Sequence, residues 1–116
     1  MAKVSNPLSK LRKIGDTVYL SGELGFDDNQ QIVPGGIEAE TARVLERMSA
    51  TLATDGLTLE DVVSCTCYLT DKSDFAGFNK VYREFFKDPF PARTTVEVQL
   101  MLDAKLEVTA VAKARS

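Results

Sequence analysis

The chain has 116 residues, of which 44% are hydrophobic and 27% charged, as in an ordinary globular domain that can bury a core without metals or disulfides. Its formal net charge is -3 and its lysines and arginines are scattered, so nucleic acid is not expected as a partner. The chain has no histidine, which excludes Ser-His-Asp and Cys-His sites and leaves poor material for a transition metal; we expect neither a metal nor a cofactor.

Neither a membrane segment nor an internal boundary is indicated by the sequence. No apolar run approaches the length that crosses a bilayer, and the first five residues lack the apolar core of a secretory signal. No linker or low-complexity stretch divides the chain. We therefore expect a single domain over residues 1–116, a cytoplasmic location and no membrane partner.

A β-hairpin is predicted near the N-terminus. Residues 11–14 and 17–21 flank Gly15, which can adopt the positive φ that a tight turn needs. The second strand ends at Ser21 and Gly22, where the missing side chain permits close approach by a ligand or another chain. From the glycine alone, a bend or bulge is the favoured interpretation.

The middle of the chain is predicted to form two strands separated by a helix. A short strand over 31–33 precedes a helix over 37–55, whose apolar residues recur every three or four positions. Residues 62–70 read as the next strand, with Cys65 and Cys67 on one of its faces. Two residues apart on a strand is a poor geometry for a disulfide, so we interpret both as buried structural thiols.

A second helix and a final strand complete the predicted elements. The helix covers 74–87 and carries aromatic residues at helical spacing, which is typical of core packing and not of a base-stacking surface. Asn79 lies beside this stripe, where its amide is either a buried, satisfied group or a ligand contact. The final strand is predicted over 105–113.

The segment 89–100 delivers one arginine, Arg93, from a proline-stiffened turn into a strand. Alternation predicts one face directed to the core (Thr94, Val96, Val98 and Leu100) and one opposite face (Arg93, Thr95, Glu97 and Gln99). An arginine among polar groups suits the wall of an anion-binding cleft. An interface ion pair of Arg93 with Glu97 or Glu107 is the structural alternative, and the strand pattern alone favours neither.

The order of elements predicts an α+β fold in which two helices pack on one face of a mixed β-sheet. The other face of such a sheet needs cover, and residues such as Val111 make it partly apolar. We therefore expect that another copy of the chain covers it.

Several short motifs resemble those of the RidA/YjgF reactive-intermediate deaminase family, also called the L-PSP endoribonuclease family, and the resemblance spans nearly the whole chain. The motifs are Val18-Tyr19-Leu20-Ser21-Gly22, Gly56-Leu57 with Asp61-Val62-Val63, Asp74-Phe75-Ala76-Gly77-Phe78-Asn79, Phe90-Pro91-Ala92-Arg93-Thr94-Thr95-Val96-Glu97-Val98, and Leu106-Glu107-Val108.

The resemblance implies a chorismate-mutase-like fold that assembles as a homotrimer around a β-barrel, with clefts between subunits. It also implies a hydrolase of C=N bonds that converts imines and enamines, such as 2-iminobutyrate and 2-iminopropionate, to 2-oxo acids and ammonia. Arg93 matches the arginine that binds the substrate carboxylate, and Glu107 the glutamate associated with the attacking water. The further cleft residues implied are Ser21, Gly22, Asn79 and Thr95.

Four positions depart from the family pattern. Leu8 stands where a cleft tyrosine is found, Thr95 where a cysteine is found, and Glu40 and Arg47 where the first helix commonly has glutamine and asparagine. The change to leucine could weaken activity on small imines or admit a larger, less polar substrate, so a pathway-specific deaminase, such as a 2-aminomuconate deaminase, is an alternative. Another is a regulatory trimer that binds 2-oxo acids without turnover. An endoribonuclease or translation inhibitor is disfavoured by the acidic charge and the absence of histidine.

The distance between the two expected catalytic residues favours a site shared between subunits. If the strands containing Val96 and Val108 form a hairpin, with Thr95 and Glu107 on one face, Arg93 and Glu107 are about four residues, or ~13 Å, apart along the strand. One small substrate spans that distance poorly. We hypothesise that the Glu107 serving a given Arg93 comes from the neighbouring subunit.

Overall fold

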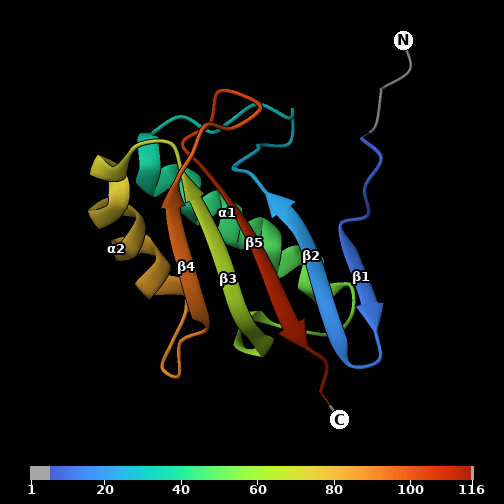
Figure 1. The fold of residues 1–116 in the computed structure, drawn as a ribbon. Coiled ribbons are helices and arrows are strands. Elements are labelled where there is room, and N and C mark those ends of the chain that lie inside the picture. Colours follow the sequence, from blue (N-terminus) through green and yellow to red (C-terminus); the bar gives the residue numbers. More distant parts are fainter. Residues whose placement is uncertain (1–5, 116) are drawn as a thin grey trace.

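The computed structural model describes residues 6–115, which form a five-stranded mixed sheet with two helices on one face (Figure 1). The strand order is β1-β2-β5-β3-β4; all neighbours are antiparallel except β3 and β4. The strands are β1 (Leu11–Ile14), β2 (Thr17–Glu23), β3 (Val62–Leu69), β4 (Ala92–Glu97) and β5 (Leu106–Lys113). The helices are α1 (Gly36–Ala53) and α2 (Phe75–Phe85), and 3-10 turns at Leu59–Asp61 and Lys72–Asp74 precede β3 and α2, respectively. The predicted α+β architecture is confirmed.

The N-terminal hairpin is confirmed, whereas the short strand over 31–33 is wrong. β1 and β2 pair around Gly15, whose φ of +61° is the positive value the turn requires. Residues 31–33 form only an isolated bridge, between Ile32 and Phe26. The Asp27 carboxylate accepts hydrogen bonds from the backbone N–H groups of Asn29 and Gln31, at 2.8 and 2.9 Å. These local bonds hold the segment as a compact loop instead of a strand.

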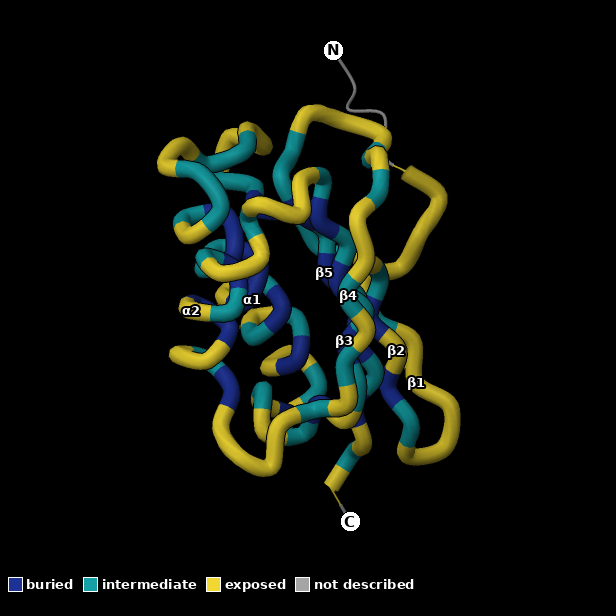
Figure 2. The backbone as a smooth tube through the Cα atoms, turned by 60° about the vertical axis from the view of Figure 1, so that its left-hand side comes forward, coloured by how far each residue is buried: buried dark blue, intermediate teal, exposed yellow. Residues whose placement is uncertain are grey.

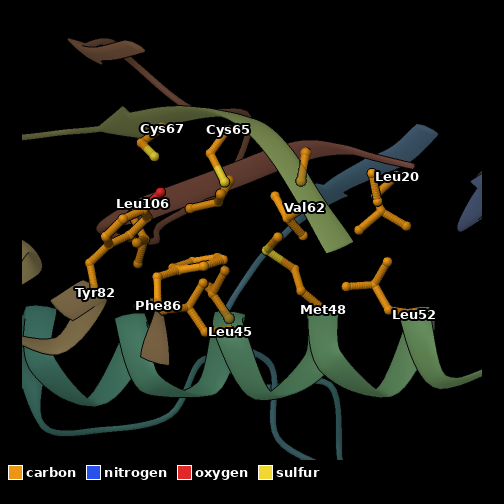
Figure 3. Close-up of a cluster of buried hydrophobic side chains, with 14 of the residues drawn as sticks. Leu20, Leu45, Met48, Leu52, Val62, Cys65, Cys67, Tyr82, Phe86 and Leu106 are labelled. Carbon is orange, nitrogen blue, oxygen red and sulfur yellow. The ribbon is translucent and has the colours of Figure 1, made fainter. Parts of the chain in front are cut away.

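Both helices bury the faces that the sequence indicates. In α1 the buried positions are Glu40, Thr41, Val44, Leu45, Met48 and Leu52. In and just after α2 they are Phe78, Val81, Tyr82 and Phe86. Figure 3 shows Leu45, Met48, Tyr82 and Phe86 pointing toward β3 and β5, where Cys65, Cys67 and Leu106 meet them. Cys65 and Cys67 are buried and unpaired, as expected of structural thiols.

The predicted faces of β4 are reversed in the structure. β4 runs parallel to β3, with Arg93 opposite Cys65 and Thr95 opposite Cys67, so both side chains share the helix-covered face. Thr94 and Val96 lie on the exposed side. Hydrophobic alternation misassigned the faces because the aromatic rings of α2 cover the arginine. β4 ends at Glu97, so Val98 and Leu100 fall outside it.

The sheet face turned away from the helices, called the open face below, is partly exposed along its length (Figure 2). The expected hairpin between the strands of Val96 and Val108 is wrong, because β3 separates β4 from β5. The open face carries several apolar side chains, including Tyr19 and Val96, which is 40% exposed.

Within residues 6–115, neither helix is long and apolar enough to span a membrane.

We predict that truncating Leu45 removes a large part of the fold's stability. Leu45 is fully buried between the helices and the sheet, so Leu45→Ala should lower the free energy of unfolding by about 2–5 kcal/mol. Met101, which is 95% exposed, offers the control, and Met101→Ala should change it by less than about 0.5 kcal/mol. Chemical denaturation at one protein concentration measures both. Equal losses in the two variants would contradict this account of the core.

Candidate functional site

Arg93 lies on a platform of three aromatic rings, which we call the arginine cluster. Its guanidinium carbon is 4.8 Å from the ring centre of Tyr82, 5.3 Å from that of Phe78 and 5.7 Å from that of Phe75. These distances are those of cation–π contacts, which hold the charge without neutralising it. Among residues 6–115, no carboxylate forms an ion pair with Arg93. Within one chain, therefore, neither Glu97 nor Glu107 pairs with Arg93, and an ion pair across a subunit interface stays the structural alternative.

The helical spacing of α2 builds this platform. Phe75, Phe78 and Tyr82 recur at three and four residues, so their rings lie on one side of the helix, over β4. Phe78 and Tyr82 are buried, whereas Phe75 is 44% exposed at the rim. Thr95, two residues after Arg93 on the same strand face, has its hydroxyl buried with no hydrogen-bond partner in the described part of the chain.

Glu107 forms the second group of the candidate site, on the open face. Its carboxylate lies over Gly22: a methyl group at Gly22 would come within 2.1 Å of Glu107 Oε2, so any larger residue there would displace the carboxylate from this position. The pairing of β2 with β5 is irregular between Leu20 and Glu23, which marks the bulge expected as one explanation of Gly22. We call Glu107, Gly22 and the adjoining Thr109 the carboxylate cluster.

The carboxylate cluster borders a hollow of about 470 Å³. Its lining residues are Gly22, Tyr68, Val98, Gln99, Leu100, Glu107 and Thr109. Thr109 is fixed by a 2.7 Å hydrogen bond that its hydroxyl donates to the backbone oxygen of Leu20. Partial burial, followed by the negative charge of Glu23, raises the pKa of Glu107 above that of an ordinary glutamate. A carboxylate of this kind is a better proton acceptor near neutral pH.

One chain does not bring Arg93 and Glu107 together. Tyr68 pairs with both Val96 and Glu107 across the sheet, so these three residues share the open face. Arg93 pairs with Cys65 on the opposite, helix-covered face. β3 also lies between the two strands that carry the expected catalytic pair.

Ser21 lies next to Gly22 of the carboxylate cluster, whereas Asn79 lies beside the arginine cluster. The Ser21 hydroxyl donates a 2.5 Å hydrogen bond to the backbone oxygen of Ser9, which fastens the N-terminal segment to β2. Asn79 is partly buried on α2, one turn from both Phe75 and Tyr82, and so adjoins the arginine cluster. Leu8, at the position of the family tyrosine, is exposed.

Sequence reasoning missed two features of the site. The aromatic spacing of α2 predicts only core packing, whereas its rings also contact Arg93. The ion pair between Glu23 and Arg47, with 2.6 Å between Oε1 and Nε, was not predicted. Opposite charges 24 positions apart give no local signal, because only the packing of α1 on β2 brings them together.

The thiols and the metal-ligating residues offer no competing chemistry in the described part of the chain. Burial raises the pKa of Cys67 to about 12 and also raises that of Cys65, so both thiols stay protonated at neutral pH. Among residues 6–115, no group of three or more Cys, Asp or Glu side chains is placed to hold a metal ion.

Comparison with known proteins identifies the family. Residues 2–114 match the family model described as Endoribonuclease L-PSP. A RutC family protein of Saccharolobus solfataricus is 41% identical over 113 residues, covering 96% of this chain and 90% of the relative. The human 2-iminobutanoate/2-iminopropanoate deaminase is 35% identical over 108 residues, which cover 91% of this chain and 79% of the relative. The crystal structure of RidA from a Psychrobacter species is similar, with a TM-score of 0.90 and 34% sequence identity. The match covers 96% of this chain and 91% of the RidA chain. The chain therefore belongs to the RidA/L-PSP family.

We predict that the two thiols are unreactive in the native protein. Iodoacetamide at pH 8 should leave Cys65 and Cys67 unmodified, because both are buried and protonated at that pH. The same reagent should alkylate both thiols once guanidinium chloride has unfolded the chain. Mass spectrometry counts the adducts, and rapid labelling of the native protein would show that the sulfur atoms are accessible.

Proposed function

We propose that the protein hydrolyses 2-imino acids and their enamine tautomers to 2-oxo acids and ammonia in the cytoplasm, as a homotrimer whose sites lie between subunits. The observation that carries the proposal is Arg93, a cation held on three aromatic rings with no carboxylate partner among residues 6–115. Because no carboxylate in this range neutralises the guanidinium, its positive charge is available to bind an anionic ligand. The deaminase names among relatives at 35–36% identity support the same reaction.

In this proposal Arg93 binds the substrate carboxylate. A guanidinium can donate two parallel hydrogen bonds to a carboxylate, which fixes both the position and the orientation of the substrate. The aromatic platform limits the movement of the guanidinium and shields one of its faces from water. Thr95 and Asn79 adjoin the arginine cluster and are the further candidate contacts to the ligand.

Glu107 serves as the group that orients and deprotonates water. An imine carbon is already electrophilic, so water adds to it, and the C–N bond then breaks to release ammonia and leave the 2-oxo acid. The raised pKa of Glu107 makes its carboxylate a suitable acceptor for the proton of that water. Gly22 leaves the space that this carboxylate occupies. No thiol is required, in keeping with Thr95 at the position of the family cysteine.

The placement of the two clusters on opposite faces of the sheet supports a site that is shared between subunits. Arg93 lies under α2 at the β4 edge of the sheet, and Glu107 lies on the open face. The open face of one copy, placed against the β4 edge of the next, unites Glu107 with Arg93. It also covers apolar side chains of the open face, including Tyr19 and Val96. Cyclic symmetry then generates three equivalent sites.

The test of this function is imine hydrolysis by the native protein and by Arg93→Ala. Imines generated by an amino-acid oxidase should yield ammonia and 2-oxo acid faster with the native protein. Arg93→Ala should lower kcat/KM by roughly 100-fold, because two charge-assisted hydrogen bonds to the carboxylate are lost. Arg93→Lys should recover only part of it, since an ammonium group lacks the planar pair of donors.

Arg83→Ala is the matched control, because Arg83 is exposed on the same helix that carries the platform. Its activity should equal that of the native protein. Arg93-dependent binding of 2-oxo acids without any acceleration would contradict the enzyme and favour a binding protein. Acceleration that survives Arg93→Ala would place the site elsewhere.

A further inference from the structure

An ion pair joins Arg47 of α1 to Glu23, at the end of the β2 bulge that lies beneath Glu107. Arg47 Nε lies 2.6 Å from Glu23 Oε1, and the two side chains are only 24% and 13% exposed. Arg47 is also held over the ring of Phe26, at 5.7 Å, and its second nitrogen approaches the backbone oxygen of Phe26 at 3.5 Å. A partly buried, well-aligned pair of this kind is less screened by solvent than a surface pair.

The location of Glu23 connects this ion pair to the carboxylate cluster. Glu23 follows Gly22 directly and pairs with Val108, the neighbour of Glu107 on β5. The irregular pairing between Leu20 and Glu23 turns Glu23 toward α1 while Gly22 stays beneath the Glu107 carboxylate. The ion pair therefore anchors the end of the bulge on which Glu107 rests.

We propose that Glu23 and Arg47 are positioning residues for Glu107: their ion pair holds the bulge under its carboxylate and sets the net charge beside it. The consequence for turnover rests on the proposed function, whereas the effect on Glu107 itself does not.

Glu23 is the charged group that acts on Glu107 from the elements packed against it. β2 contributes Glu23, and β3 contributes Tyr68, directly opposite Glu107. The segment 98–100, which lines the rest of the hollow, contains Val98, Gln99 and Leu100 and has no titratable group. The negative charge of Glu23 disfavours the ionised form of Glu107, in the same direction as burial. Arg47 offsets part of that charge.

This arrangement predicts that neutralising Glu23 and neutralising Arg47 shift the pKa of Glu107 in opposite directions. Glu23→Gln removes the negative charge, so the pKa of Glu107 should fall. Arg47→Gln leaves that charge without its partner, so the pKa of Glu107 should rise. The double variant Glu23→Gln/Arg47→Gln removes both charges, so its Glu107 pKa should lie between those of the two single variants. A purely structural loosening of the bulge would move both single variants in the same direction.

The direct test is a titration of Glu107 by carboxyl-carbon NMR, with Glu107→Gln identifying its signal. Arg43→Gln is the matched control. Arg43 lies one turn earlier on α1 and donates to the backbone oxygen of Phe26, but its carboxylate partners are the exposed Asp28 and Glu46 instead of Glu23. We expect the Glu107 midpoint to fall in Glu23→Gln, to rise in Arg47→Gln and to move least in Arg43→Gln. Midpoints that move together, or that Arg43→Gln moves as much as Arg47→Gln, would overturn the proposal.

Turnover supplies the second readout. If Glu107 is the base, kcat/KM falls as the pH drops through its pKa, so the acid limb should shift down in Glu23→Gln and up in Arg47→Gln. On that limb Arg47→Gln should lose about three-fold or more, whereas at high pH it should approach the native rate. An NMR response of the expected signs in a protein without imine hydrolysis would refute the proposed function and leave the coupling of Glu23 to Glu107 standing.

Discussion

The structure depends on one constraint, a guanidinium held at the edge of a sheet by aromatic rings instead of by a carboxylate. Arg93 could not occupy the helix-covered face of β4 without a partner for its charge, and Phe75, Phe78 and Tyr82 provide a partner that does not neutralise it. The same three rings join α2 to the sheet. The same face of α2 therefore contributes to the stability of the fold and holds the guanidinium that is proposed to bind an anion.

The alternation of side chains along the strands explains why one copy of the chain holds only half of the proposed site. Arg93 shares a face with the buried Cys65, and Glu107 shares the other face with Tyr68. No change of side-chain rotamer can bring groups on opposite faces into one cleft. A second copy can do so, and the partly apolar open face gives it a surface on which to pack.

The sequence predicted the elements better than their faces. The hairpin at Gly15, both helices and the buried pair of Cys65 and Cys67 followed from local rules of turn geometry and periodicity. The direction of Arg93 did not, because hydrophobic alternation cannot anticipate a charge covered by rings from a distant helix. The order of β3, β4 and β5, and the ion pair of Glu23 with Arg47, likewise depend on contacts between distant segments. The family motifs point to Arg93, Glu107 and Gly22; the structure places the Glu107 carboxylate over Gly22 and puts Arg93 on the opposite face of the sheet.

The most direct test of the shared site is subunit complementation between Arg93→Ala and Glu107→Gln. Each variant alone should be nearly inactive in imine hydrolysis. When equal amounts are unfolded together and refolded, a site that takes Arg93 from one variant and Glu107 from the other is intact, which predicts about a quarter of the native activity. Recovery at that level would establish that the two residues act across an interface. A mixture no more active than the separate variants would contradict the account.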